Sequence, residues 1–167
     1  TAVLTQDGQL ALERMDNLVN LISKLKNEKN LQVILVSSGA VGAGFTSLKL
    51  DKKIVANKQA LAAIGQPLLL KHYKKRFKQH NIVCAQMLFI ADDFDSRKRS
   101  KNAQNVMEIL LDNNILPIIN ENDVIATEEL VFGDNDQLAA HVAYYFKADM
   151  LAILSDIDGY YNKNPRE

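Results

Sequence analysis

The chain has 167 residues, of which 47% are hydrophobic, and its 20 basic residues balance 20 acidic ones. This length is enough for one domain with a substantial core, and the neutral balance argues against nucleic acid or a membrane surface as the main partner, because both usually require a basic excess. The single cysteine, Cys84, lies in an apolar run, which fits a reducing, cytoplasmic compartment and a core position rather than a nucleophilic role.

Helices and strands are predicted to alternate along the whole chain. Apolar residues at three- and four-residue spacing mark the helices, and short unbroken apolar runs mark strands that are buried on both faces of a sheet. In the first half of the chain, these patterns predict a helix over about residues 9–28, a strand at 31–36, a small-residue turn at 37–44 that opens a helix, and a helix over 57–80 interrupted near Gly65 and Pro67. In the second half, they predict strands at 82–89, 115–119 and 150–154, helices over 92–113 and 134–148, and a hairpin at 124–132. This order predicts a single domain with a three-layer α/β/α sandwich and a mostly parallel central sheet.

The turn Ser37–Gly44, after the first predicted strand, is rich in glycine. Ligands of open α/β sheets bind beyond the carboxyl ends of the strands. Glycines there let the backbone approach a ligand, the next helix offers free amides, and Ser38 could add a hydroxyl. The alternative explanation is tight helix–sheet packing with a serine N-cap, and the spacing alone does not decide between the two. The turn lacks the Gly-Lys-Ser/Thr step of a Walker loop.

Four polar residues, Asn120 to Asp123, follow the strand predicted at 115–119. A hydrophilic turn would explain them, but four in succession after a buried strand favour a ligand site. Asp123 and Asn120 are expected to hold a ligand ammonium group, since a carboxylate and an amide oxygen both accept N–H donors.

The segment Gly133–Asp136 places three polar side chains at the start of a predicted helix, where one is enough as a cap. The surplus favours a ligand contact. Asn135 can donate and accept in one such contact, and Asp136 can orient neighbouring lysines by its charge. After the last predicted strand, Ser155 and Asp156 could contact a nucleotide, although turns of this kind are common.

Taken together, these turns resemble those of the amino acid kinase family and follow the order of its motifs. The matching motifs are Ser37–Gly44, Lys58-Gln59 with Ala62–Gln66, Pro117–Asp123, Gly133–Asp136, and Ser155-Asp156 with Asp158–Tyr161. The resemblance covers nearly the whole chain. It is strongest to the members that phosphorylate L-glutamate, because the asparagine-rich strand end and the Gly-Asp-Asn-Asp turn distinguish them from members that act on acetylglutamate or uridylate.

The resemblance implies that the γ-phosphoryl group of ATP, with Mg²⁺ as cofactor, is transferred to the side-chain carboxylate of L-glutamate, as the first step of proline synthesis. A carboxylate is already a nucleophile, so this reaction needs alignment and cancellation of charge rather than a general base. The resemblance also implies proline as a feedback inhibitor and a homo-oligomer, either a dimer or a tetramer. From the charge balance we expect no nucleic acid or membrane partner, and from the spacing of His72, His80 and His141 we expect no metal-binding residue.

Roles for individual residues follow from the same resemblance. Ser38, Asp123 and Asn135 match the family's glutamate-binding residues, and Asn120 is a weaker fourth. Asp136 matches the carboxylate that organises the catalytic lysines. The adenine-nucleotide contact is matched by Ser155 and Asp156.

Both ends of the sequence look cut, and the two lysines that cancel charge in the family would precede Thr1 and follow Glu167. We therefore expect residues 1–167 to form one truncated kinase domain that has little or no activity alone. Two alternatives stay open. One is another small-carboxylate or carbamate kinase of the same fold, and the other is a non-catalytic module that senses proline or glutamate.

Overall fold

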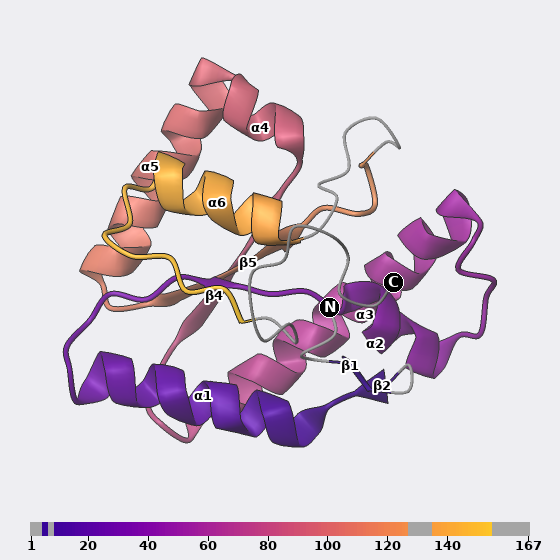
Figure 1. Cartoon of the computed structure of the whole chain (residues 1–167), viewed down its shortest axis with the longest axis horizontal. Coiled ribbons are helices and arrows are strands. Elements are labelled where there is room, and N and C mark those ends of the chain that lie inside the picture. The colour runs from indigo at the N-terminus through magenta and orange to yellow at the C-terminus, as the bar shows by residue number, and fades with distance from the viewer. Residues whose placement is uncertain (1–4, 7–8, 127–134, 155–167) are drawn as a thin grey trace, which may run out of the picture.

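The computed structural model describes residues 5–6, 9–126 and 135–154 (Figure 1). In chain order, its elements are β1 (Thr5–Gln6), β2 (Gln9–Leu10), α1 (Leu12–Asn27), β3 (Leu35–Val36), α2 (Ala40–Ser47), α3 (Val55–Lys78), β4 (Cys84–Phe89), α4 (Ala91–Asp95), α5 (Arg97–Asp112), β5 (Leu116–Glu121) and α6 (Asn135–Tyr145).

The central sheet of the described residues is parallel and has the strand order β3-β5-β4. Val36 pairs with Ile119, and Phe89 pairs with Glu121, so the carboxyl ends of all three strands lie at the same edge. Strands β1 and β2 form a separate antiparallel pair. The parallel register therefore brings the segments that follow β3, β4 and β5 close together.

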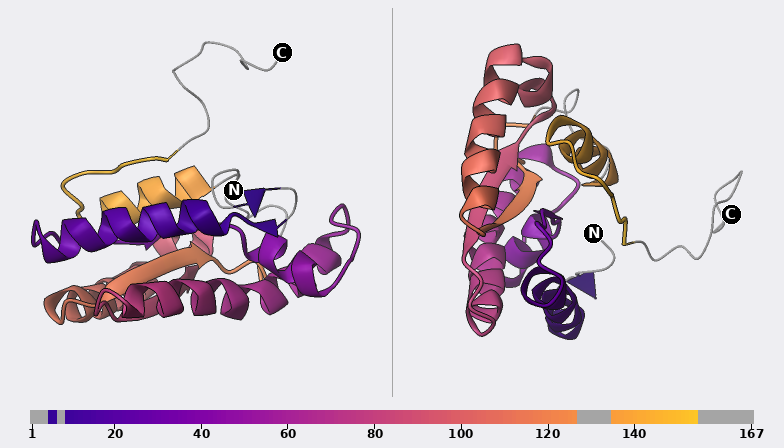
Figure 2. Two further views of the ribbon diagram at one scale, coloured as in Figure 1. Left: turned by 90° about the horizontal axis from the view of Figure 1, so that it is seen from below. Right: turned by 90° about the vertical axis from the view of Figure 1, so that its left-hand side faces the viewer.

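Helices cover both faces of this sheet (Figures 1 and 2). Neighbouring residues of a strand point to opposite faces. Ile118 accordingly packs with residues of α1 and α3, whereas Ile119 packs with residues of α5 and α6. The predicted three-layer α/β/α sandwich with a parallel sheet is confirmed.

Helices α2 and α3 touch through their backbones at two glycines. A Cβ atom on Gly44 would lie 1.9 Å from the carbonyl oxygen of Leu61, and one on Gly65 would lie 1.7 Å from that of Ala40. Neither distance leaves room for a side chain. Gly44 therefore serves helix–helix packing, rather than the helix–sheet packing considered from the sequence.

The start of α2 also differs from the expected serine cap. Its N-cap residue is Gly39, which has φ 102° and no side-chain capping bond. A glycine adopts this left-handed conformation without the steric cost that a side chain brings. Ser38 lies just before the cap and is half-buried.

The interruption predicted near Gly65 and Pro67 is wrong, because α3 runs through both residues. A proline inside a helix removes one backbone donor and crowds the carbonyl four residues earlier, but α3 continues through Pro67 and packs along its buried face. The helix predicted over 92–113 is divided at Ser96, whose extended backbone separates α4 from α5. The Ser96 side chain then caps α5 by accepting a bond from the Arg99 amide at 3.4 Å.

The strand predicted at 150–154 is also wrong. These residues follow α6 without strand pairing in the described part of the chain, and Met150 is 80% exposed. An apolar run needs a neighbouring strand to form a ladder, and the sequence pattern cannot supply one. Of the hairpin predicted at 124–132, residues 127–132 lie outside the described residues, while 124–125 belong to a turn.

Cys84 is buried, as predicted. Within residues 5–6, 9–126 and 135–154, the structure has no helix with the length and apolar character needed to cross a membrane.

Candidate functional site

The carboxyl edge of the sheet gathers three of the segments singled out in the sequence. The Ser37 amide donates to the Ile119 carbonyl at 2.8 Å, which extends the pairing of β3 with β5 beyond Val36. On the other side of β5, the Asn122 amide donates to the Phe89 carbonyl at 2.8 Å. Residues 37–38 and 120–123 are therefore fixed next to each other by backbone hydrogen bonds.

Asn120 is buried, and its orientation is fixed by its neighbours. Its Oδ1 accepts from the backbone amide of Glu121 at 2.9 Å and from Nδ2 of Asn135 at 3.0 Å. A backbone N–H can only donate, so the oxygen of the Asn120 amide must face Glu121. The Nδ2 atom then points elsewhere, and it is buried with no hydrogen-bond partner among the described residues.

This unpaired amide group changes the role expected for Asn120. A buried donor without a partner costs about 1–3 kcal/mol, and such groups in native structures call for an explanation. The prediction that Asn120 accepts from a ligand ammonium group is wrong, because its oxygen already has two donors. What the side chain offers is an N–H donor, which suits a carboxylate oxygen.

Asn135 begins α6 and ties it to two strands. Its Nδ2 donates to the Ser37 carbonyl and to Oδ1 of Asn120. Both amide hydrogens are therefore used inside the protein, and any ligand contact of this side chain goes through its Oδ1. The predicted ligand contact of Asn135 stays a prediction, and its donating half conflicts with the two hydrogen bonds that Nδ2 already makes.

Asp123 lies in the turn directly after β5 and is half-buried. Burial raises the pKa of its carboxyl group above the usual 3.8, and a backbone hydrogen bond only partly opposes this. A carboxylate that is destabilised by burial gains from a cationic partner. Asp123 therefore suits an ammonium group, as expected from the sequence.

The remaining predicted residues are less informative. Asp136 lies in the first turn of α6, and its side chain is exposed. Ser155 and Asp156, predicted to contact a nucleotide, lie outside the described residues. The structure thus brings Ser38, Asn120 and Asn135 together through Ser37, and places Asp123 at the same strand end.

Two buried polar residues of α3 were missed in the sequence. Tyr73 lies 2.9 Å from Ser37, hydroxyl to hydroxyl, and Gln66 donates through Nε2 to the Glu121 carbonyl at 3.1 Å. Burial raises the pKa of Tyr73 to about 12, so its hydroxyl stays protonated near neutral pH. The available signal was the seven-residue spacing of these polar residues in a helix whose buried positions are otherwise mostly apolar.

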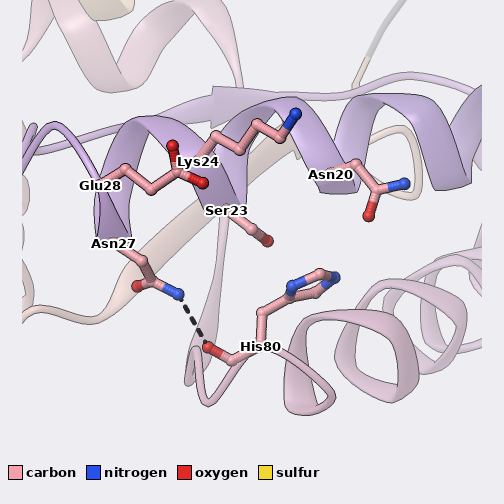
Figure 3. Close-up of a pocket in the computed structure, with 6 residues that line it drawn as sticks. All are labelled: Asn20, Ser23, Lys24, Asn27, Glu28 and His80. Atoms are coloured by element: carbon pink, nitrogen blue, oxygen red, sulfur yellow. Dashed lines mark hydrogen bonds between the residues drawn. The ribbon is translucent and has the colours of Figure 1, made fainter.

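A polar cavity of about 320 Å³ lies away from this edge, between α1 and the residues that follow α3 (Figure 3). Its lining residues are Asn20, Ser23, Lys24, Asn27, Glu28 and His80. Asn27 is engaged there, since its Nδ2 donates to the His80 carbonyl at 3.0 Å. Of the predicted site residues that the structure describes, none lines this cavity.

Comparisons with known proteins agree with the resemblance. A family model described as "Amino acid kinase family" matches residues 1–167. A glutamate 5-kinase of Wolinella succinogenes is 56% identical over 171 residues, which cover 100% of this chain and 65% of that relative. The glutamate 5-kinases of Leishmania donovani and Clostridium acetobutylicum are 53% and 46% identical, covering 99% and 95% of this chain and 62% and 60% of those relatives. The chain therefore spans about three fifths of the length of these relatives.

Proposed function

The chain belongs to the amino acid kinase family, and on that premise we propose that it binds L-glutamate in an enzyme that transfers the γ-phosphoryl group of ATP to the glutamate side-chain carboxylate. The observation that carries this proposal is the buried, unpartnered Nδ2 of Asn120 at the same strand end as Asp123. A donor and an anion at the same strand end suit the carboxylate and the ammonium group of an amino acid. The glutamate 5-kinase relatives support the same choice of substrate.

In this proposal, Asp123 accepts hydrogen bonds from the substrate ammonium group, and Asn120 donates to the α-carboxylate bonded to the same carbon. The side-chain carboxylate then extends toward Ser38 and the start of α2. The N-cap residue of that helix is Gly39, which has no side chain to cap it, so the first amides and the partial positive charge of the helix favour an anion. The protein's task is alignment and charge stabilisation, because the substrate carboxylate is itself the nucleophile.

ATP and Mg²⁺ belong to the proposal as well. Among the described residues, no group of three or more His, Cys, Asp or Glu side chains could hold a metal ion. A Mg²⁺ ion would therefore be held mainly by the phosphates of ATP, as is usual in phosphotransferases. When bound, it neutralises negative charge on the transferring phosphoryl group.

The proposal also assigns Asp136, at the exposed start of α6, as the carboxylate that organises lysines, and Ser155 with Asp156 as nucleotide contacts.

Proline feedback, assembly into a dimer or tetramer, and a cytoplasmic location complete the proposal. They rest on the family and on the glutamate 5-kinase relatives. The buried thiol of Cys84 is compatible with a reducing compartment.

A coupled ADP-release assay tests the proposal. It is run on the full-length protein, because the relatives are longer than this chain, with ATP and either L-glutamate, N-acetylglutamate, aspartate or carbamate. We expect turnover with L-glutamate and little with the other three. Turnover with N-acetylglutamate or carbamate in preference to L-glutamate would contradict the substrate, and no turnover with any of them would contradict the kinase activity.

A further inference from the structure

Helix α3 carries three polar side chains at seven-residue spacing, namely Gln59, Gln66 and Tyr73. Seven residues correspond to almost two helical turns, so the three side chains lie on one face of the helix. Each is hydrogen-bonded to a different segment at the carboxyl edge of the sheet. The helix runs along one face of that sheet, where it can reach these segments in succession (Figures 1 and 2).

Tyr73 reaches the end of β3. Its hydroxyl and that of Ser37 are 2.9 Å apart, and both residues are buried, at 0% and 2% exposure. The Ser37 hydroxyl also donates to the Ser38 carbonyl at 3.2 Å, so the Tyr73 hydroxyl is the donor of the pair. The Ser37 carbonyl in turn accepts from Asn135. The residue that Tyr73 holds is therefore the one that precedes Ser38 and anchors α6.

Gln66 and Gln59 reach the end of β5 and the turn after it. Gln66 is buried, donates to the Glu121 carbonyl at 3.1 Å, and accepts from Nε2 of Gln86 at 3.3 Å. Gln59 donates to the Ala126 carbonyl at 3.2 Å. These two bonds hold both ends of residues 121–126, which include Asp123, and the first of them lies next to Asn120 in the sequence.

Apolar side chains would pack at these buried positions without the cost of desolvating polar groups. Three buried or half-buried hydrogen bonds from one helix face to three site segments therefore indicate more than packing. We propose that Tyr73 and Gln66 are positioning residues, which set the relative placement of the ends of β3 and β5 and thereby of Ser38, Asn120 and Asn135. The effect expected on the glutamate KM rests on the proposed function, whereas the placement of the ends of β3 and β5 does not.

The kinetic test uses Tyr73→Phe and Gln66→Met in the full-length protein, each of which removes the hydrogen bond with little change in volume. Exposed positions of the chain provide the same changes as controls, Tyr144→Phe and Gln79→Met. We expect each test variant to raise the glutamate KM about 5- to 10-fold, as for loss of one hydrogen bond, with the ATP KM within about twofold of wild type. A merely structural role would lower the active fraction and leave both KM values unchanged.

Ser37→Ala provides a second route to the same bond if Tyr73→Phe folds poorly. We expect it to raise the glutamate KM as Tyr73→Phe does. The double variant should be no worse than the more affected single variant, because both remove one interaction. Fully additive effects on the glutamate KM would contradict the coupling between the two hydroxyls.

Amide hydrogen exchange provides a readout that does not depend on activity. We expect peptides covering residues 36–39 and 119–126 to exchange faster in the test variants than in the controls, at equal global stability. If the wild type fails to phosphorylate glutamate, the proposed function fails, and the exchange data alone decide the positioning role. Unchanged exchange in both peptides would overturn the inference, as would an unchanged glutamate KM in an active enzyme.

Discussion

Replacing Gly65 by alanine tests the backbone contact that holds α2 against α3. The new Cβ would lie 1.7 Å from the Ala40 carbonyl oxygen and 2.6 Å from the Gly44 amide nitrogen, whereas real Cβ contacts are essentially never shorter than 3.0 Å. Both obstacles are backbone atoms, so no side chain can rotate away. The two helices would have to separate by more than 1 Å.

Two opposing terms set the size of the effect. Alanine in a helix is favoured over glycine by about 1 kcal/mol, while overpacking of a tight contact costs about 1–3 kcal/mol and occasionally more. Because the contact is with rigid backbone, we expect the upper end of that range and a net loss of about 2 kcal/mol. For a protein of this size or somewhat larger, this corresponds to a Tm lower by about 4–8 °C.

Thermal and urea unfolding of Gly65→Ala, followed by circular dichroism, measure this loss. Ala63→Gly, at an exposed position of the same helix, measures the propensity term alone and should cost about 1 kcal/mol. Because α2 begins beside Ser38, the glutamate KM of Gly65→Ala should also rise. A Tm equal to or above wild type would refute the close contact, since alanine at an unconstrained helical site stabilises.

Four further predictions concern two side chains, Asp123 and Cys84. Asp123→Asn should raise the glutamate KM about 10-fold or more, because loss of a hydrogen bond to a charged group costs about 1.5–3 kcal/mol, while the ATP KM stays constant; an unchanged glutamate KM would remove Asp123 from the site. Burial raises the pKa of Asp123, so as the pH is lowered, kcat/KM for glutamate should begin to fall at a higher pH than an ordinary aspartate would cause. In Asp123→Asn this fall at low pH should be absent. Between the usual pKa of 3.8 and the raised pKa, the Asp123 carboxyl group is protonated in the folded protein but ionised in the unfolded chain. The free energy of unfolding should therefore increase as the pH falls through this range. Burial also raises the pKa of the Cys84 thiol to about 11, so Ellman's reagent should label it slowly at pH 8 in the native protein and fast in urea; rapid native labelling would contradict its burial.

The layers of the fold were predictable because local patterns determine them. The apolar run that contains Ile118 and Ile119 predicts a strand covered on both faces, and each of these residues does pack against a different helix layer. The same kind of run at 150–154 failed as a predictor, because strand formation there depends on a partner strand. Pro67 failed for a related reason, since packing along α3 outweighs one missing backbone donor.

The placement of the candidate residues was predictable, but the hydrogen bonds of their atoms were not. Polar residues after buried strands were expected at the carboxyl edge of the sheet, and Ser38, Asn120 and Asp123 lie there; that they bind a substrate stays a prediction. Which atom of Asn120 is available depends on the Glu121 amide and on Asn135, which lies 15 residues further along the chain. The Tyr73–Ser37 bond joins residues 36 positions apart. Such contacts exist only in the folded chain and have no local signature.

Calorimetric titration of Asn120→Asp with L-glutamate, in the full-length protein, tests the central claim most directly. The substitution keeps an oxygen for the Glu121 amide and for Asn135, and it replaces the NH₂ group, which has no partner among the described residues, by an acceptor that can also carry a negative charge. The account predicts that Asn120→Asp folds and binds glutamate at least about 10-fold more weakly than the wild type. The control Asn105→Asp, at an exposed position of α5, should bind glutamate with unchanged affinity. An affinity equal to that of the wild type would contradict the claim that the buried amide of Asn120 donates to the substrate carboxylate.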